Sequence, residues 1–307
     1  FYEENDKTKY FALLPETSAI KKEYIRLLSL TDATLKVALE KELSEQMTAG
    51  SIDVNIMVKL DKENYDSNGE ILPDEYSDAN AALRGFAESK LDAAIIFSAG
   101  MNQRLYSYMS TFKDFYRDAQ GHVKKRVVIK VSDYRSSLIQ GKFLARKGIE
   151  VSEYRIESGL NCGGHAFASN GYLLPVIMQE FKENREQLGA KVMPMVKKFY
   201  KKMEWSFVGE ENAPLITVQG GIGTHGENTR MLEEYNMDRT GWASPFLLVP
   251  EATPIDDTTR KLLQRATEKE LYLSDASPLG VPFNNVVGSG SHTWTLDNIA
   301  KGTPGSG

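Results

Sequence analysis

Short runs of apolar and β-branched residues recur along the chain from residue 54 onward. Their hydrophobicity is nearly continuous, which is typical of parallel strands buried on both faces, whereas half-exposed antiparallel strands alternate. We therefore expect a parallel sheet. The six predicted strands are Val54–Lys59, Ala93–Ala99, Arg126–Val131, Tyr154–Ser158, Leu215–Gly220 and Ala243–Val249.

Stretches with helical periodicity alternate with these strands, and several begin at a Ser, Asn or Asp that could cap a helix. A βαβα alternation produces either an open doubly wound sheet or a closed barrel, and the pattern does not separate the two. The predicted helices are Ser77–Lys90, Arg104–Tyr116, Ser136–Lys147, Tyr172–Met203, Glu227–Glu234 and Asp257–Lys269.

Two further segments flank the first predicted strand. Thr17–Gln46 has an amphipathic helical pattern, either one helix or two that meet near Ser29, where Thr31 or Asp32 could cap the second. Asp61–Asp78 is rich in Asp, Asn, Gly and Glu, so we expect a loop at the carboxyl end of a strand. In a barrel, that end is the active-site side.

Composition excludes several classes of protein. With 307 residues, of which 41% are hydrophobic, the chain can bury one large core as a single large domain. Its net charge of -5 and its scattered basic residues argue against nucleic acid as a partner. A single cysteine and the lack of a long apolar run predict a cytoplasmic protein without membrane contact. The first residue, Phe1, and the loop-like last residues lead us to expect a fragment.

A glycine-rich turn follows the predicted strand Leu215–Gly220 and precedes a helix. Backbone N–H groups in such a turn can approach an anion closely, and the helix start adds partial positive charge, so phosphate is the natural ligand. A tight connection without a ligand would have the same pattern. The next strand matters because barrels often build a phosphate site from two adjacent loops. The segment that would complete such a site here is Gly241–Phe246.

A second loop presents a histidine, His165, directly after Gly163 and Gly164. Histidine can accept or donate a proton near neutral pH, and glycines let a flat ring lie against the backbone. A purely structural histidine is the alternative. Zinc binding by Cys162 with His165 is a weaker hypothesis because two ligands do not make a site, so we expect Cys162 to be a packing residue.

Together these motifs resemble the nitronate monooxygenase (2-nitropropane dioxygenase) family, which includes the FMN-dependent enoyl reductases of fatty-acid and polyketide synthesis. The resemblance rests on a strand followed by Gly-x-x-x-Gly-Gly-His, then a strand followed by Gly-Gly-Ile, and then a strand with a small pair before Phe-Leu. It covers about Ile52–Glu251 and implies an α/β fold, a (β/α)8 TIM barrel with inserted helices, that binds FMN.

The resemblance also implies roles for individual residues. Lys130 lies inside an apolar strand and would offer positive charge to the flavin ring, stabilising the anionic reduced form; a solvent-facing lysine on a barrel rim is the alternative. His165 occupies the position of the family's active-site base. The residues implied to bind FMN are Asn55, Lys130 and Ser158 near the ring, Gly163 and Gly164 along it, and Gly220, Gly221, Gly223, Gly241, Trp242, Ala243 and Ser244 around the phosphate. No metal is implied.

Matching Asn55 to the family's third strand makes the visible strands three to eight. An open barrel would expose strand edges and core, so we expect the first two strands upstream of Phe1, or an atypical substitute around Phe1–Leu14. The expected domains are a helical segment over residues 1–50, the FMN-binding barrel over 51–255, and a C-terminal helix with an extension over 256–307.

The chain departs from the family motifs at several positions. It has Asn161-Cys162 where Glu-Ala is common, Ser158 where Gln is common, and Ala243-Ser244 where Gly-Thr is common. The segment Asp257–Gly290 also resembles the enoyl reductases of polyketide and polyunsaturated-fatty-acid synthesis. Three functions stay open: oxidation of a small carbon acid with oxygen, NAD(P)H-dependent reduction of an acyl substrate, and a non-catalytic flavin-binding scaffold. A homo-oligomer is compatible with each.

Overall fold

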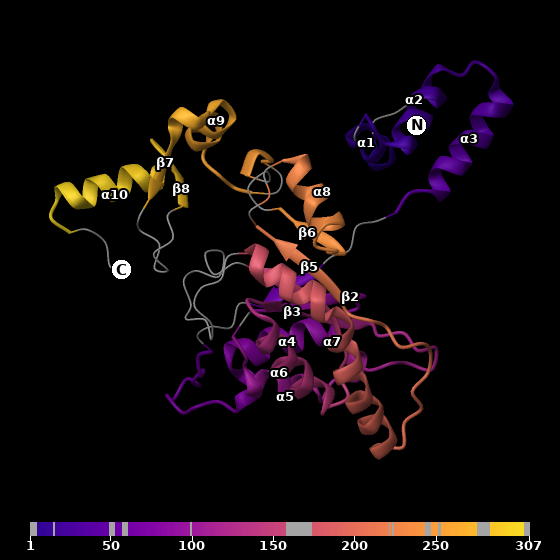
Figure 1. Ribbon diagram of the computed structural model, residues 1–307, viewed down its shortest axis with the longest axis vertical. Coiled ribbons are helices and arrows are strands. Elements are labelled where there is room, and N and C mark those ends of the chain that lie inside the picture. Colours follow the sequence, from indigo (N-terminus) through magenta and orange to yellow (C-terminus); the bar gives the residue numbers. More distant parts are fainter. Residues whose placement is uncertain are drawn as a thin grey trace. The chain divides into compact units, whose positions relative to one another are not determined.

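The computed structural model divides the chain into two compact units, Phe1–Ile52 and Asp53–Gly307 (Figure 1). Each unit is described by itself. The residues that the structure describes are 5–14, 16–48, 53–56, 61–98, 100–157, 174–220, 222, 224–242, 247–250, 253–274 and 283–303.

The first unit is helical, with α1 (Asp6–Leu13), α2 (Ala19–Ser29) and α3 (Ala33–Glu45). Of the alternatives for Thr17–Gln46, two helices are observed, and the cap of the second is Asp32 rather than Thr31, because the Asp32 carboxylate accepts hydrogen bonds from the Thr34 and Leu35 N–H groups. The described residues before position 15 form α1, so within them an atypical substitute for the missing strands would have to be helical. A small core joins these helices: Phe11, Tyr24, Leu27 and Leu43.

The second unit contains a six-stranded, fully parallel sheet in the order β1-β2-β3-β4-β5-β6, curled as a half-barrel. The predicted parallel sheet is therefore confirmed. Its strands are β1 (Asp53–Ile56), β2 (Ala93–Phe97), β3 (Lys125–Val131), β4 (Val151–Glu157), β5 (Leu215–Gln219) and β6 (Arg239–Gly241).

A helix follows each of the first five strands, as the alternating pattern predicts (Figure 1). The short 3-10 helices Asp74–Tyr76 and Lys113–Phe115 accompany α4 and α5. Helix α7 confirms the predicted helix Tyr172–Met203, with bounds that differ by only one or two residues at each end. The bounds are α4 (Asp78–Glu88), α5 (Gln103–Met109), α6 (Tyr134–Ala145), α7 (Leu174–Lys202) and α8 (His225–Glu233).

The last observed strand, β6, lies before the predicted strand Ala243–Val249. Of that predicted strand, Ala243–Phe246 lie outside the described residues, and Leu247 and Leu248 lie in a short 3-10 turn. Strand β6 pairs with β5 through Thr217 opposite Arg239. An edge strand is held by main-chain hydrogen bonds on one side, so it does not need the apolar run that marks a central strand.

The two faces of the sheet differ in chemistry, because side chains alternate along each strand. One face packs against the helices through apolar side chains such as Ile95, Ile129 and Ile156. The opposite, concave face has a small apolar patch, and its other buried side chains are polar. The patch is Ala94, Ile96 and Val128, and the buried polar residues beside it are Lys130, Glu153, Glu157 and Thr217.

The described strands do not close into a barrel. β1 and β6 are the two edges of the sheet and do not pair with each other. An unpaired edge presents free backbone N–H and C=O groups. The half-barrel therefore has two edges that could accept further strands.

The C-terminal residues form α9 (Asp257–Arg265), the antiparallel strands β7 (Leu271–Ser274) and β8 (Phe283–Val286), and α10 (Gly290–Ala300). A short 3-10 helix, Glu268–Glu270, joins α9 to β7. Among the described residues, every helix is too short or too polar to cross a membrane.

Candidate functional site

Five of the residues implied to bind FMN are described by the structure: Asn55, Lys130, Gly220, Gly241 and Trp242. The predicted base, His165, lies outside the described residues. So do the remaining implied residues, Ser158, Gly163, Gly164, Gly221, Gly223, Ala243 and Ser244.

Lys130 is buried near the carboxyl end of β3. It belongs to the concave face because it alternates with Ile129 and Val131, which pack against the helices. Its Nζ lies 3.3 Å from Glu157 Oε1, and the two side chains are 9% and 4% exposed. The alternative interpretation of Lys130 as a solvent-facing rim residue is therefore wrong.

Glu157 and Gln219 continue this polar row across the sheet. Glu157 is the last residue of β4 and stands opposite Gln219 of β5, whose side-chain amide donates a hydrogen bond to Glu157 Oε1. Gln219 in turn stands opposite Gly241 of β6. Sequence reasoning missed both Glu157 and Gln219, although an acidic residue at the end of an apolar strand, directly before a glycine-rich loop, was a signal for Glu157.

The two glycine strand ends lie beside each other, as the phosphate-site hypothesis requires. Gly220 has a φ of +85°, a conformation that favours glycine, and its N–H donates to the Gly241 carbonyl at 3.2 Å. A Cβ on Gly241 would lie 2.9 Å from the Gln219 Cβ, so a larger residue does not fit there without a shift. The carboxyl ends of β5 and β6 are thus closely joined.

Helix α8 begins immediately after this turn. Thr224 caps it by accepting a hydrogen bond from the Glu227 N–H, and Glu227 accepts in return from the Thr224 N–H at 3.0 Å. One N–H at this helix start is therefore already used by a carboxylate. Trp242 Nε1 donates to Thr240 Oγ1 at 3.1 Å, which holds the indole against β6.

Asn55 lies further from this edge. Asn55 is opposite Ile96 of β2, and Ile96 is opposite Val128 of β3. Asn55 is therefore level with Val128, which precedes Lys130 by two residues. Its side chain is exposed. The structure thus brings Lys130, Gly220 and Gly241 to one edge of the sheet and places Asn55 on β1, two strands away from Lys130.

A second charged group lies lower on the concave face. Arg155 Nη2 is 2.8 Å from Glu153 Oε1 and 3.8 Å from Asp53 Oδ2. Thr217 Oγ1 donates to the same Glu153 oxygen at 2.6 Å. These contacts tie β1, β4 and β5 together below the level of Lys130, and they compensate a carboxylate that is almost completely buried.

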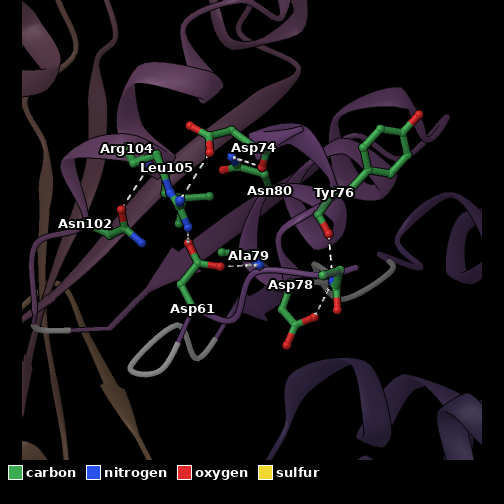
Figure 2. A network of polar contacts seen from close by, with 10 residues as sticks. Asp61, Asp74, Tyr76, Asp78, Ala79, Asn80, Asn102, Arg104 and Leu105 are labelled. Atoms are coloured by element: carbon green, nitrogen blue, oxygen red, sulfur yellow. Dashed lines mark hydrogen bonds and ion pairs between the residues drawn. The ribbon is translucent and has the colours of Figure 1, made fainter. Parts of the chain in front are cut away.

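The loop after β1 is anchored to the loop after β2 by an ion pair (Figure 2). Arg104, at the start of α5, lies 2.6 Å from Asp61 Oδ2 and 3.4 Å from Asp74 Oδ1. The other Asp61 oxygen accepts from the Ala79 N–H at 3.1 Å, and Asn80 Nδ2 donates to the Asp74 carbonyl. Because both loops follow parallel strands, this polar clamp lies on the carboxyl side of the sheet, where the sequence predicted a loop over Asp61–Asp78.

Burial by itself raises the pKa of Asp61, but the hydrogen bonds from Arg104 and the Ala79 N–H and the charge of Arg104 together hold it below its ordinary value. A carboxylate with a lowered pKa stabilises the fold above its unfolded-state pKa of about 3.9, and that stabilisation is lost as the pH falls through the folded value.

We expect Asp61→Asn to lower the free energy of unfolding by about 1–3 kcal/mol at pH 7, because it removes a charge-assisted hydrogen bond to a side chain that is 11% exposed. The difference from the unsubstituted protein should shrink as the pH falls below about 4, the region where the carboxylate becomes protonated. Urea denaturation at several pH values measures both. Asp74→Asn is the matched control, because Asp74 contacts the same arginine but is 76% exposed, and its cost should stay below about 1 kcal/mol. Equal costs for the two variants would contradict the assignment.

Within the described residues, no three His, Cys, Asp or Glu side chains are placed to hold a metal ion. In comparisons with known proteins, no family model and no curated protein sequence matches this chain.

Proposed function

We propose that this protein is an FMN-dependent oxidoreductase that oxidises a small carbon acid, with the flavin on the carboxyl side of the half-barrel. The observation that carries the proposal is the arrangement of Lys130, Gly220 and Gly241. A buried cation on β3 and two hydrogen-bonded glycines at the ends of β5 and β6 all lie at the carboxyl ends of the strands of a parallel sheet. Ligands of α/β proteins commonly bind at these ends.

The spacing of these residues suits a ligand with a charged ring at one end and a phosphate at the other. Neighbouring strands lie about 4.8 Å apart, so Lys130 and the β5 and β6 ends are separated by roughly 10–15 Å. Gly220 and the backbone N–H groups after it would hold the phosphate, and Lys130 would face the electron-rich side of the ring. Glu227 counts against a phosphate directly on the α8 axis, because its carboxylate already accepts from the helix start.

We further infer that the six strands correspond to strands three to eight of a (β/α)8 barrel. The support is the curl of the sheet, its uniform parallel order, and the charged concave face, which resembles a barrel interior more than a surface. Two additional strands pairing with the open edges of β1 and β6 would complete such a barrel. Asn55, on an edge strand, would then face the barrel interior.

In the proposed reaction, His165 would take a proton from the carbon acid, and glycines at positions 163 and 164 carry no side chain that would obstruct a flat ring. When bound, FMN would accept the electrons of the substrate and pass them to oxygen. Lys130 contributes positive charge where negative charge accumulates. A nitroalkane is a carbon acid of this kind, and loss of its α-proton to His165 would give the alkyl nitronate that is oxidised.

NAD(P)H-dependent reduction of an enoyl group on an acyl carrier is the second candidate. It is favoured by the sequence of Asp257–Gly290, which resembles enoyl reductases. A flavin-binding scaffold without turnover is the third. Assays with nitronate and oxygen, and with a crotonyl thioester and NAD(P)H, distinguish the three. An absorption spectrum with flavin bands, followed by release of FMN on denaturation, tests the cofactor that the first two share.

We expect His165→Ala to retain FMN but lose at least about 100-fold in turnover, because a general base is removed while the phosphate and ring contacts stay. The measurements are flavin content and steady-state rate. His122→Ala is the control, since His122 lies before β3, at the opposite end of the sheet, and is half exposed. Full activity in His165→Ala would show that His165 lines the pocket or is structural.

A further inference from the structure

A buried carboxylate stands between the lysine and the glycine strand ends of the proposed site. Glu157 Oε1 lies 3.3 Å from Lys130 Nζ on one side and accepts from the Gln219 amide on the other. Glu157, Gln219 and Gly241 form one transverse row at the carboxyl ends of β4, β5 and β6. Lys130 has Arg155 as its register partner, and its side chain reaches two residues further along β4 to contact Glu157 in this row.

We propose that Glu157 is a positioning residue that fixes the Lys130 ammonium and sets the net charge that a bound flavin ring meets. This inference rests on the proposed function, because it assigns the purpose of the ion pair to the flavin. Glu157 itself need not contact the ring. It acts through Lys130, and Gln219 holds its carboxylate in place.

Charge balance supports this role. A buried ammonium and a buried carboxylate each lose hydration, and their mutual attraction offsets part of that cost. The pair presents a ligand with a fixed dipole and almost no net charge, whereas a lone lysine would present a full positive charge. The reduced, anionic flavin is stabilised by positive charge close to the ring. Glu157 therefore opposes part of the effect of Lys130 and keeps reduction from becoming too favourable.

The location of the Lys130–Glu157 pair distinguishes it from the other buried ion pair on the concave face, which has a structural role. The lower pair, Arg155 with Glu153, ties β1, β4 and β5 together and also involves Thr217 and Asp53. Glu157, in contrast, is the last residue of its strand and directly precedes the segment that contains His165. Its row ends at Gly241, beside the strand end of Gly220.

The test is the flavin reduction potential of the purified protein, measured by anaerobic reductive titration against a reference dye. Glu157→Gln keeps the shape and the acceptor for Gln219 but removes the charge, so it should favour reduction by about tenfold, or about 30 mV for a two-electron couple. Lys130→Met should shift the potential in the opposite direction. Glu157→Asp, which keeps the charge on a shorter side chain, should fall between the unsubstituted protein and Glu157→Gln, and it serves if Glu157→Gln does not fold.

Glu153→Gln is the matched control. It removes a buried carboxylate from the same strand, one that contacts Arg155 rather than Lys130, and its potential should stay at the value of the unsubstituted protein. If Glu157→Gln or Glu157→Asp binds FMN with an unchanged potential, or shifts it in the direction of Lys130→Met, the inference is overturned while the proposed function stands. If the unsubstituted protein shows no flavin absorption, the proposed function fails and this inference fails with it.

Discussion

Replacing Gly221 by aspartate is expected to abolish FMN retention. Gly221 follows Gly220, whose positive φ directs the chain out of β5 toward α8. A carboxylate at this turn adds bulk and negative charge where backbone N–H groups would face a phosphate. Existing negative charge from Glu227 at the start of α8 leaves little tolerance for another. The measurement is the flavin content of the purified protein, from its absorption and from FMN released on denaturation.

Gly85→Asp is the control for this prediction. Gly85 lies on the exposed side of α4, and a Cβ there meets no other atom within 4 Å. The variant carries the same new charge on a different βα unit and should keep its FMN. Unchanged flavin occupancy in Gly221→Asp would rule out the phosphate site at the β5–α8 turn.

The second large effect concerns stability rather than the proposed site. We expect Arg117→Met to lower the free energy of unfolding by about 3–5 kcal/mol, because it leaves the Glu150 carboxylate buried without its cation. Arg117 is 1% exposed and forms a two-pronged pair with Glu150, with Nε–Oε1 and Nη2–Oε2 distances of 2.6 and 2.8 Å. Its Nη1 donates to the Val208 carbonyl, and its guanidinium lies over the Phe207 ring. One side chain thus connects the segment before β3, the start of β4 and the segment after α7.

Urea denaturation followed by tryptophan fluorescence is a suitable measurement, because Trp205 packs against Tyr116 and Tyr200 near Arg117. Arg126→Met is the matched control. Arg126 also pairs with an aspartate, Asp92, but the two side chains are 34% and 52% exposed, so its loss should cost less than about 1 kcal/mol. A loss of similar size in both variants would mean that burial of the Arg117 pair does not govern its contribution.

The site was predictable only in part, and the reason lies in which side chains a pattern can reveal. A lysine inside the apolar run of β3 stands out in the sequence, so Lys130 could be singled out before its burial was known. Its partner Glu157 lies 27 positions later on another strand, and Gln219 lies on a third. Their proximity depends on the register of adjacent strands. A shift of one residue in that register would turn these side chains to the opposite face of the sheet.

The proposed phosphate site was likewise predictable only in part. The glycines at positions 220 and 241 mark two turns in the sequence. That Gly220 donates a hydrogen bond to Gly241 follows from β6 pairing with β5 at Arg239–Gly241, three residues with no apolar pattern. An edge strand gains its place from main-chain hydrogen bonds, so hydrophobicity located it several residues too late.

Features that depend on neighbours along the chain could be read from the sequence: the buried central strands, the helices between them, and a cap at Thr31 or Asp32. The Asp32 carboxylate accepts hydrogen bonds from the N–H groups two and three positions ahead. Which distant charges meet becomes visible only in the folded chain, as in Lys130 with Glu157, Asp61 with Arg104, and Arg117 with Glu150. Local structure follows from periodicity and capping, which act over a few residues. A buried ion pair is selected by strand order, register and the shared loss of water, and these arise only when the sheet has formed.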